Sequence, residues 1–161
     1  MPLGRPPTKP SFPVDIYRLG NSIERLTGLI EFSAIEYETM GRQFIGEKNY
    51  NVPPVPFLGR MWKLMLQTVN NHICKIALHI VLINGDEGSR CAMETAQFCA
   101  DQLGEPVEQQ TGLFLWDTTD GNVILQTGEL NEGFVLGLFL TRRPTGPFEL
   151  APHAGKRVTC F

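Results

Sequence analysis

The stretch LGRMWKLMLQTVNNHICKIALHIVLING, residues 58–85, decides the fold because it holds two long apolar segments in immediate succession. In its first half the apolar residues fall at positions 58, 61, 62, 65 and 69, which is the i, i+3, i+4, i+7 spacing of an amphipathic helix. Residues 72–83 are dense in β-branched and apolar residues and too few for a buried helix of ordinary length. The sequence therefore predicts a helix over 58–70 followed by a central strand.

The segments before this stretch predict a strand and a loop. Residues 26–39 alternate between apolar and polar side chains, the pattern of a half-buried strand. Residues 41–56 are rich in Gly, Asn and Pro, and the run Pro53-Pro54-Val55-Pro56 opposes regular structure. We expect an exposed loop there.

The segment after the central strand predicts a second, shorter helix. The polar residues 84–88 end the strand, and Ser89 is a suitable N-cap. Over residues 91–103 four side chains share one helical face, namely Ala92, Ala96, Cys99 and Leu103, and Gly104 and Pro106 follow as stop signals.

The last third of the chain is strongly β. Residues 112–116, 122–126 and 134–142 predict a three-stranded antiparallel meander, with Asp120-Gly121 as the sharpest turn signal. The predicted fold class is α+β, with an antiparallel sheet packed on the amphipathic helix 58–70, one or two short helices, and extended N- and C-terminal arms.

Both ends of the chain are rich in proline. Residues 1–14 hold five prolines, which predicts an extended, partly polyproline arm, and residues 144–161 predict a proline-containing basic tail. Between them, the length suits a single globular domain over residues 15–143. Such arms bury little surface of their own, so they favour a role in reaching a partner over that of flexible solvated tails.

The net charge of -3 is the sum of three unequal zones. Residues 1–90 carry ten Lys and Arg against eight Asp and Glu, residues 91–141 carry none against eight, and residues 142–161 carry four against one. We call residues 91–141 the acidic zone. Because phosphate contacts need cations, the acidic zone cannot grip nucleic acid or an anionic membrane, and such contacts are expected at the two ends.

The sequence also indicates a compartment. No apolar segment follows Met1, so we expect no secretory signal, and no apolar run approaches the length of a membrane span. The four cysteines, Cys74, Cys91, Cys99 and Cys160, are few and irregularly spaced, which predicts buried thiols in a reducing compartment.

No motif for catalysis or for a cofactor emerges from the spacing of reactive residues. Residues 84–90 lie where a phosphate-binding loop could lie, but Asp86 and Glu87 oppose an anion. His72 and Cys74 share one strand face, yet two ligands do not close a metal site. We therefore expect a protein that is not an enzyme and that uses no cofactor or metal.

The order of elements resembles that of the rhabdovirus matrix proteins. The similarity lies in residues 58–85, in LFLWDTTDGN (residues 113–122) and in FVLGLFLTRR (residues 134–143). The resemblance implies a virion protein of the host cytoplasm and inner membrane surface. That protein would self-associate, condense the viral nucleoprotein–RNA complex and link it to the envelope during budding. The family recruits budding machinery through a proline-tyrosine motif, and the matching residues 6–10 lack the tyrosine.

The expected partners are a second copy of the chain in an open head-to-tail assembly, the nucleoprotein–RNA complex, an anionic membrane and the envelope glycoprotein tail. The candidate residues for self-association are Pro6, Pro7, Pro10, Phe12, Pro53, Pro54, Val55 and Pro56. The candidate residues for contact with membrane or nucleoprotein are Arg5, Lys9, Arg142, Arg143, Lys156 and Arg157. Two alternatives stay open: a small α/β ligand-binding or enzymatic domain that uses residues 84–90, and a viral adaptor that forms no lattice.

Overall fold

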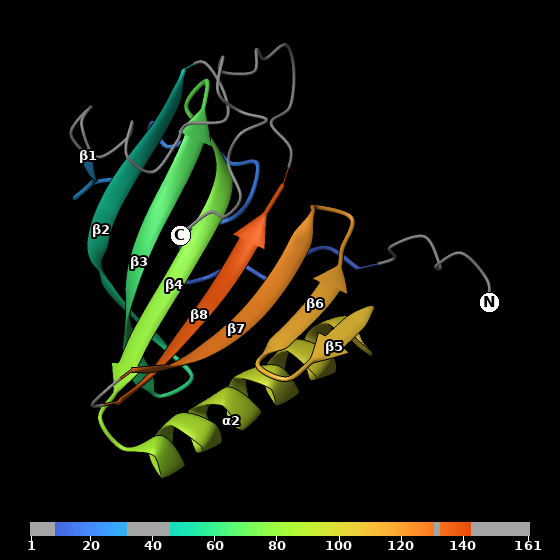
Figure 1. The fold of residues 1–161 in the computed structure, drawn as a ribbon. Helices are drawn as coiled ribbons and strands as arrows, with labels where there is room; N and C mark the ends of the chain where they lie inside the picture. The colour runs from blue at the N-terminus through green and yellow to red at the C-terminus, as the bar shows by residue number, and fades with distance from the viewer. Residues whose placement is uncertain (1–8, 32–45, 131–132, 143–161) are drawn as a thin grey trace.

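The computed structural model describes residues 9–31, 46–130 and 133–142 (Figure 1). Within these ranges the protein is an α+β fold with one antiparallel sheet of eight strands and a single helix. The strands are β1 (Ile30–Glu31), β2 (Glu47–Phe57), β3 (Arg60–Val69), β4 (His72–Leu82), β5 (Glu108–Gln110), β6 (Leu113–Asp117), β7 (Asn122–Leu130) and β8 (Gly133–Thr141). The helix is α2 (Gly85–Leu103).

The sheet is built from two meanders that meet at its centre. Its strand order is β1-β2-β3-β4-β8-β7-β6-β5, so β1–β4 follow one another, and β5–β8 return from the opposite edge until β8 pairs with β4. The helix α2 connects the two meanders and contacts β4, β7 and β8. The predicted strand at 72–83 and the predicted meander are confirmed as β4 and as β6, β7 and β8.

The predicted helix over 58–70 is wrong, because this segment is the turn after β2 followed by β3. On β3 the buried side chains Trp62, Leu64 and Leu66 alternate with outward-facing ones, which is the period of a strand. The turn between β3 and β4 is formed by Asn70 and Asn71, with φ of 54° and 62°. Two consecutive positive φ values give the type I′ turn that matches strand twist, so the two apolar segments pair as a hairpin.

The predicted loop over 41–56 is also wrong for its described part, because residues 47–57 form β2. β1 pairs only with Tyr50 and Asn51, so among the described strands the following part of β2 pairs with β3 alone. Proline lacks an N–H donor and is tolerated on such an edge. A bulge between Val52 and Val55 accommodates the proline pair.

The helix α2 is longer than its prediction at its N-terminal end. The cap is Asn84 and not Ser89: the Asn84 Oδ1 accepts the backbone N–H of Asp86 at 2.8 Å and of Glu87 at 3.4 Å. The helix ends at Gly104, where φ is 89°. Its buried residues Cys91, Thr95 and Cys99 face the sheet.

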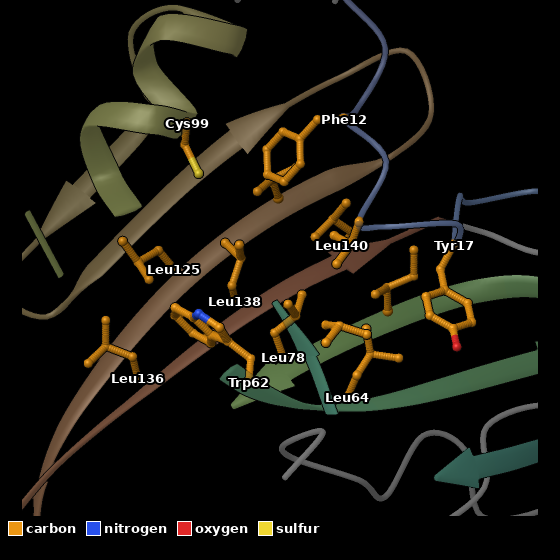
Figure 2. Close-up of a cluster of buried hydrophobic side chains, with 14 of the residues drawn as sticks. Phe12, Tyr17, Trp62, Leu64, Leu78, Cys99, Leu125, Leu136, Leu138 and Leu140 are labelled. Carbon is orange, nitrogen blue, oxygen red and sulfur yellow. The ribbon is translucent and has the colours of Figure 1, made fainter. Parts of the chain in front are cut away.

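The N-terminal segment, residues 9–23, crosses the same sheet face as α2, which we call the core face (Figure 2). Phe12, Val14, Tyr17 and Leu19 are buried there. Residues 11–14 of the extended arm predicted over 1–14 thus pack against the protein's own sheet. At the far end of the segment, backbone hydrogen bonds join Gly20 to Ile73 and Asn21 to Ile73.

Other predictions are confirmed in part. Of the strand predicted over 26–39, the structure shows Ile30–Glu31, and residues 32–39 lie outside the described residues. Cys74, Cys91 and Cys99 are buried free thiols, as expected, whereas Cys160 and the tail 144–161 lie outside the described residues.

Candidate interaction groove

A groove lies between α2 and the hairpin of β5 and β6, at the margin of the core face, and it holds about 320 Å³. Helix, connecting loop and hairpin all contribute to its lining. The lining residues are Ala92, Met93, Ala96, Gln97, Ala100, Glu105, Pro106, Gln109, Phe114 and Trp116. All ten belong to the acidic zone.

The wall of the groove is a side of α2 in which a row of alanines lies beside the longer side chains of Met93 and Gln97. Ala92, Ala96 and Ala100 are spaced four residues apart, so they lie one above another along the helix. A helix side of alanines cannot fill the space beside the sheet margin. The short alanine side chains therefore contribute to the open space of the groove.

The floor of the groove is a pair of aromatic rings on β6. Phe114 and Trp116 are two residues apart on one strand, so both point to the core face. Their rings stack with centroids 5.8 Å apart and an interplanar angle of 13°. The Trp116 Nε1 donates to the Gly104 carbonyl at 3.0 Å, which satisfies the indole N–H and fixes the end of α2 against β6.

The rim of the groove is polar and bears negative charge. Glu105, Gln97 and Gln109 are exposed there. The Gln97 side chain also donates to the carboxylate of Asp101 at 2.8 Å, which holds a second acid beside the rim. Since residues 91–141 contain no Lys or Arg, no cation from this part of the chain neutralises these acids.

Most side chains in the groove lining are apolar. Its lining contains no His, Cys, Ser or Lys. The nearby helix thiols face the sheet instead, where burial raises the pKa of Cys91 and raises that of Cys99 to about 12. Thiols of this kind stay protonated and are poor nucleophiles. An aromatic floor with an acidic rim suits an extended apolar segment that carries a cation.

The described residues offer no metal cluster, because no three His, Cys, Asp or Glu side chains among them gather closely enough to hold an ion. The residues 84–90, considered above for a phosphate, form the cap and first turns of α2. There the Asn84 side chain already accepts from the two backbone donors of Asp86 and Glu87. No helix among the described residues has the length and apolar character to cross a membrane.

The residues predicted for self-association do not gather in one place. Phe12 is buried in the core, and Val55 is buried opposite Trp62 on the core face. The neighbouring prolines 53, 54 and 56 are exposed along the sheet edge, and Pro10 is exposed on the N-terminal segment. Pro6 and Pro7 lie outside the described residues.

The residues predicted for membrane or nucleoprotein contact are separated in the same way. Lys9 is exposed, and its carbonyl accepts the Thr119 N–H at 3.0 Å, which ties the segment to the turn between β6 and β7. Arg142 packs its guanidinium over Gly20, so it lies against the N-terminal segment. The remaining four, Arg5, Arg143, Lys156 and Arg157, lie outside the described residues.

Sequence reasoning missed the groove although two of its signals were in the sequence. Ala92 and Ala96 share one helical face, and small residues at that spacing leave room beside a helix. Phe114 and Trp116 are separated by one residue on a predicted strand and so share a face. The sequence does not show that the alanine row of α2 and the aromatic pair of β6 meet at the sheet margin.

No protein-family model, no curated protein and no solved structure matches this chain.

Proposed function

We propose that the chain is a matrix-type viral structural protein that assembles head to tail. In that role it condenses the viral nucleoprotein–RNA complex and links it to the inner surface of the envelope membrane. The observation that carries the proposal is the aromatic-floored, acid-rimmed groove beside α2. Its lining suits an extended segment that carries prolines and a cation, and this chain has such a segment at its N-terminus.

The proposed occupant is residues 1–8, MPLGRPPT, of a neighbouring copy. Proline-rich segments bind aromatic-lined grooves because their polyproline conformation loses little entropy on binding. Arg5 lies directly before the Pro6-Pro7 pair, so a ring contact at the floor brings its guanidinium to the rim. Glu105 is the exposed lining acid that can pair with it.

The position of the groove favours an open assembly. The described chain starts at Lys9, beside Thr119 at the end of the β6–β7 turn, whereas the groove lies between α2 and β6. The attachment point of the segment, at Lys9, and the groove are thus different places on the described surface. A contact between them across two copies is heterologous, and such a contact repeats without closing.

The test is sedimentation velocity of the full chain over a concentration series. Wild type should associate without a fixed end point. Ala100→Leu places a larger side chain in the groove and should abolish association. Gln102→Leu adds the same side chain to an exposed position of α2 outside the groove lining, so it should associate as wild type does.

A charge exchange tests the ion pair. Arg5→Glu and Glu105→Lys should each weaken association, and the double variant should restore it. Exposed pairs are screened over roughly 8 Å at physiological ionic strength, so association should also weaken with salt. A wild type that stays monomeric at every concentration, or an Ala100→Leu variant that associates normally, contradicts the proposal.

A second candidate is an adaptor that forms no lattice and binds a proline-rich segment of another protein in the same groove. The groove volume of about 320 Å³ also lies at the lower end of the roughly 300–1,000 Å³ of small-molecule pockets. An adaptor and a protein that binds a small molecule in this groove would both remain a discrete monomer or dimer at every concentration. Thermal shift with a synthetic MPLGRPPT peptide then separates them, because a groove for such segments is stabilised by the peptide.

A further inference from the structure

The sheet face opposite α2, which we call the outer face, exposes aliphatic side chains at one end. Met61 on β3, Val81 on β4 and Ile83 directly after β4 are 59%, 57% and 88% exposed, and we call these three the outer-face patch. The cross-strand partners continue it, because Met61 pairs with the exposed Pro56 and Val81 pairs with Val135. With these partners, the apolar surface around the patch extends over β2, β3, β4 and β8.

The charge beside the patch is positive. Lys63 is exposed and pairs with His79 in the cross-strand row next to Met61 and Val81. Burial, and to a smaller extent the charges of Lys75 and Lys63, lower the pKa of His79. The groove, by contrast, lies at the core face and has an acidic rim.

Among the described residues, the acids Asp86, Glu87 and Glu129 at this end of the sheet belong to the other side. Asp86 and Glu87 are on the first turn of α2, which packs on the core face. Glu129 pairs with Phe134, whose ring packs against the core, so its side chain is on that side too. An anionic partner that approaches the outer face thus meets the ammonium group of Lys63 before it meets any of these three carboxylates on the core side.

We propose that the outer-face patch inserts into an anionic lipid surface, with the three aliphatic side chains entering the boundary of the acyl chains and Lys63 binding the headgroups. This inference rests on the proposed function and moves its membrane contact from the chain ends to the folded domain. A lipid surface fits better than a peptide because Val81 and Ile83 lie at one end of the sheet, where β4 ends beside the start of β8 (Figure 1). Aliphatic insertion combined with cationic attraction is the general mode of peripheral membrane binding.

The experiment is flotation of the full chain with vesicles of phosphatidylcholine alone or with added phosphatidylserine. The triple variant Met61→Thr, Val81→Thr, Ile83→Thr keeps strand-compatible side chains and should reduce binding to the anionic vesicles by about tenfold or more. Lys63→Glu should reduce binding to anionic vesicles and leave the weak binding to neutral vesicles unchanged. Val107→Thr is the matched control, because Val107 is 58% exposed away from the patch, and it should bind as wild type does.

The result that overturns the inference is unchanged vesicle binding of a folded triple variant, as judged by circular dichroism. A second result would also overturn the inference: vesicle binding is lost on charge reversal of the cations near the two chain ends and is unaffected in the triple variant. These cations are Arg5, Lys9, Arg143, Lys156 and Arg157. Sedimentation without vesicles keeps the two proposals apart. The triple variant should still associate head to tail, whereas a wild type that binds vesicles but never self-associates contradicts the proposed function alone.

Discussion

Replacing Phe12 with alanine tests whether the chain before Val14 belongs to the folded domain. Phe12 is 6% exposed, and its ring meets the ring of Phe98 on α2 edge to face with centroids 5.0 Å apart. It also stacks on Phe57 at the end of β2, at 6.3 Å. The side chain therefore joins the N-terminal segment to both the helix and the sheet, and we expect Phe12→Ala to destabilise the protein strongly.

The size of the effect follows from what the ring loses. Burial of a phenylalanine side chain contributes about 1.5–3 kcal/mol, and an aromatic pair adds about 0.5–1.5 kcal/mol. Phe→Ala changes in protein cores cost about 3–5 kcal/mol. Because Phe12 lies on a terminal segment that can partly collapse onto the space left behind, we expect the lower end, about 3 kcal/mol. For a chain of 161 residues this corresponds to a fall in Tm of about 6–12 °C.

The assay is urea unfolding followed by tryptophan fluorescence, since Trp62 lies 5.8 Å from the Phe57 ring and is itself buried. The control is Ile16→Ala, which removes a large apolar side chain from the same segment at a position that is 64% exposed, and it should change stability by less than about 0.5 kcal/mol. If Phe12→Ala costs under about 1 kcal/mol, the segment is a loosely attached arm and the reasoning is refuted.

Three further predictions concern stability. Among the buried side-chain nitrogen and oxygen atoms of the described residues, Thr68 Oγ1 alone has no hydrogen-bond partner. Thr68→Val should therefore raise the free energy of unfolding by about 1–2 kcal/mol. A fall in the free energy of unfolding would instead show that the hydroxyl has a partner. Asn84→Ala removes the cap of α2 and should cost about 1 kcal/mol in urea unfolding, whereas Ser89→Ala should cost much less. Burial raises the pKa of Cys74 and Cys99 from 9.0 to about 12, so the unfolded chain loses these protons first and stability should fall from pH 9 towards 12. Each thiol contributes up to about 1.4 kcal/mol per pH unit, and Cys99→Ala should flatten a plot of stability against pH.

The last third of the chain was predictable because its strands and turns are specified locally. Around Asp120-Gly121 the chain needs positive φ, and Gly121 has φ of 148° with its Cα so close to the Thr141 carbonyl that a Cβ would collide. Thr118 closes the turn, its backbone N–H donating to the Gly121 carbonyl at 2.7 Å. Short-range chemistry of this kind is readable without knowledge of the fold.

The proline-rich segments were predicted wrongly because their structure depends on distant neighbours. Pro53, Pro54 and Pro56 are compatible with a strand only because the described strands leave the adjoining edge of β2 without a partner, and strand order is not visible in the sequence. Likewise, Phe12 is buried because its ring packs against Phe57 on β2 and Phe98 on α2. The candidate groove was hidden for the same reason, since its helix wall and its aromatic floor come from separate elements.

The helix wrongly predicted over residues 58–70 and the outer-face patch have one physical origin, namely apolar residues on both faces of β3. Trp62, Leu64 and Leu66 alternate as a strand requires, but Met61 and Met65 add apolar residues on the opposite face, and together these positions also fit the spacing of a helix. A sheet face in contact with water only would carry polar residues at 61 and 65, and the alternation would then have been clear. Apolar residues on both faces of a strand are typical of a strand with contacts on both sides. The feature that misled the prediction thus supports a partner for the outer face.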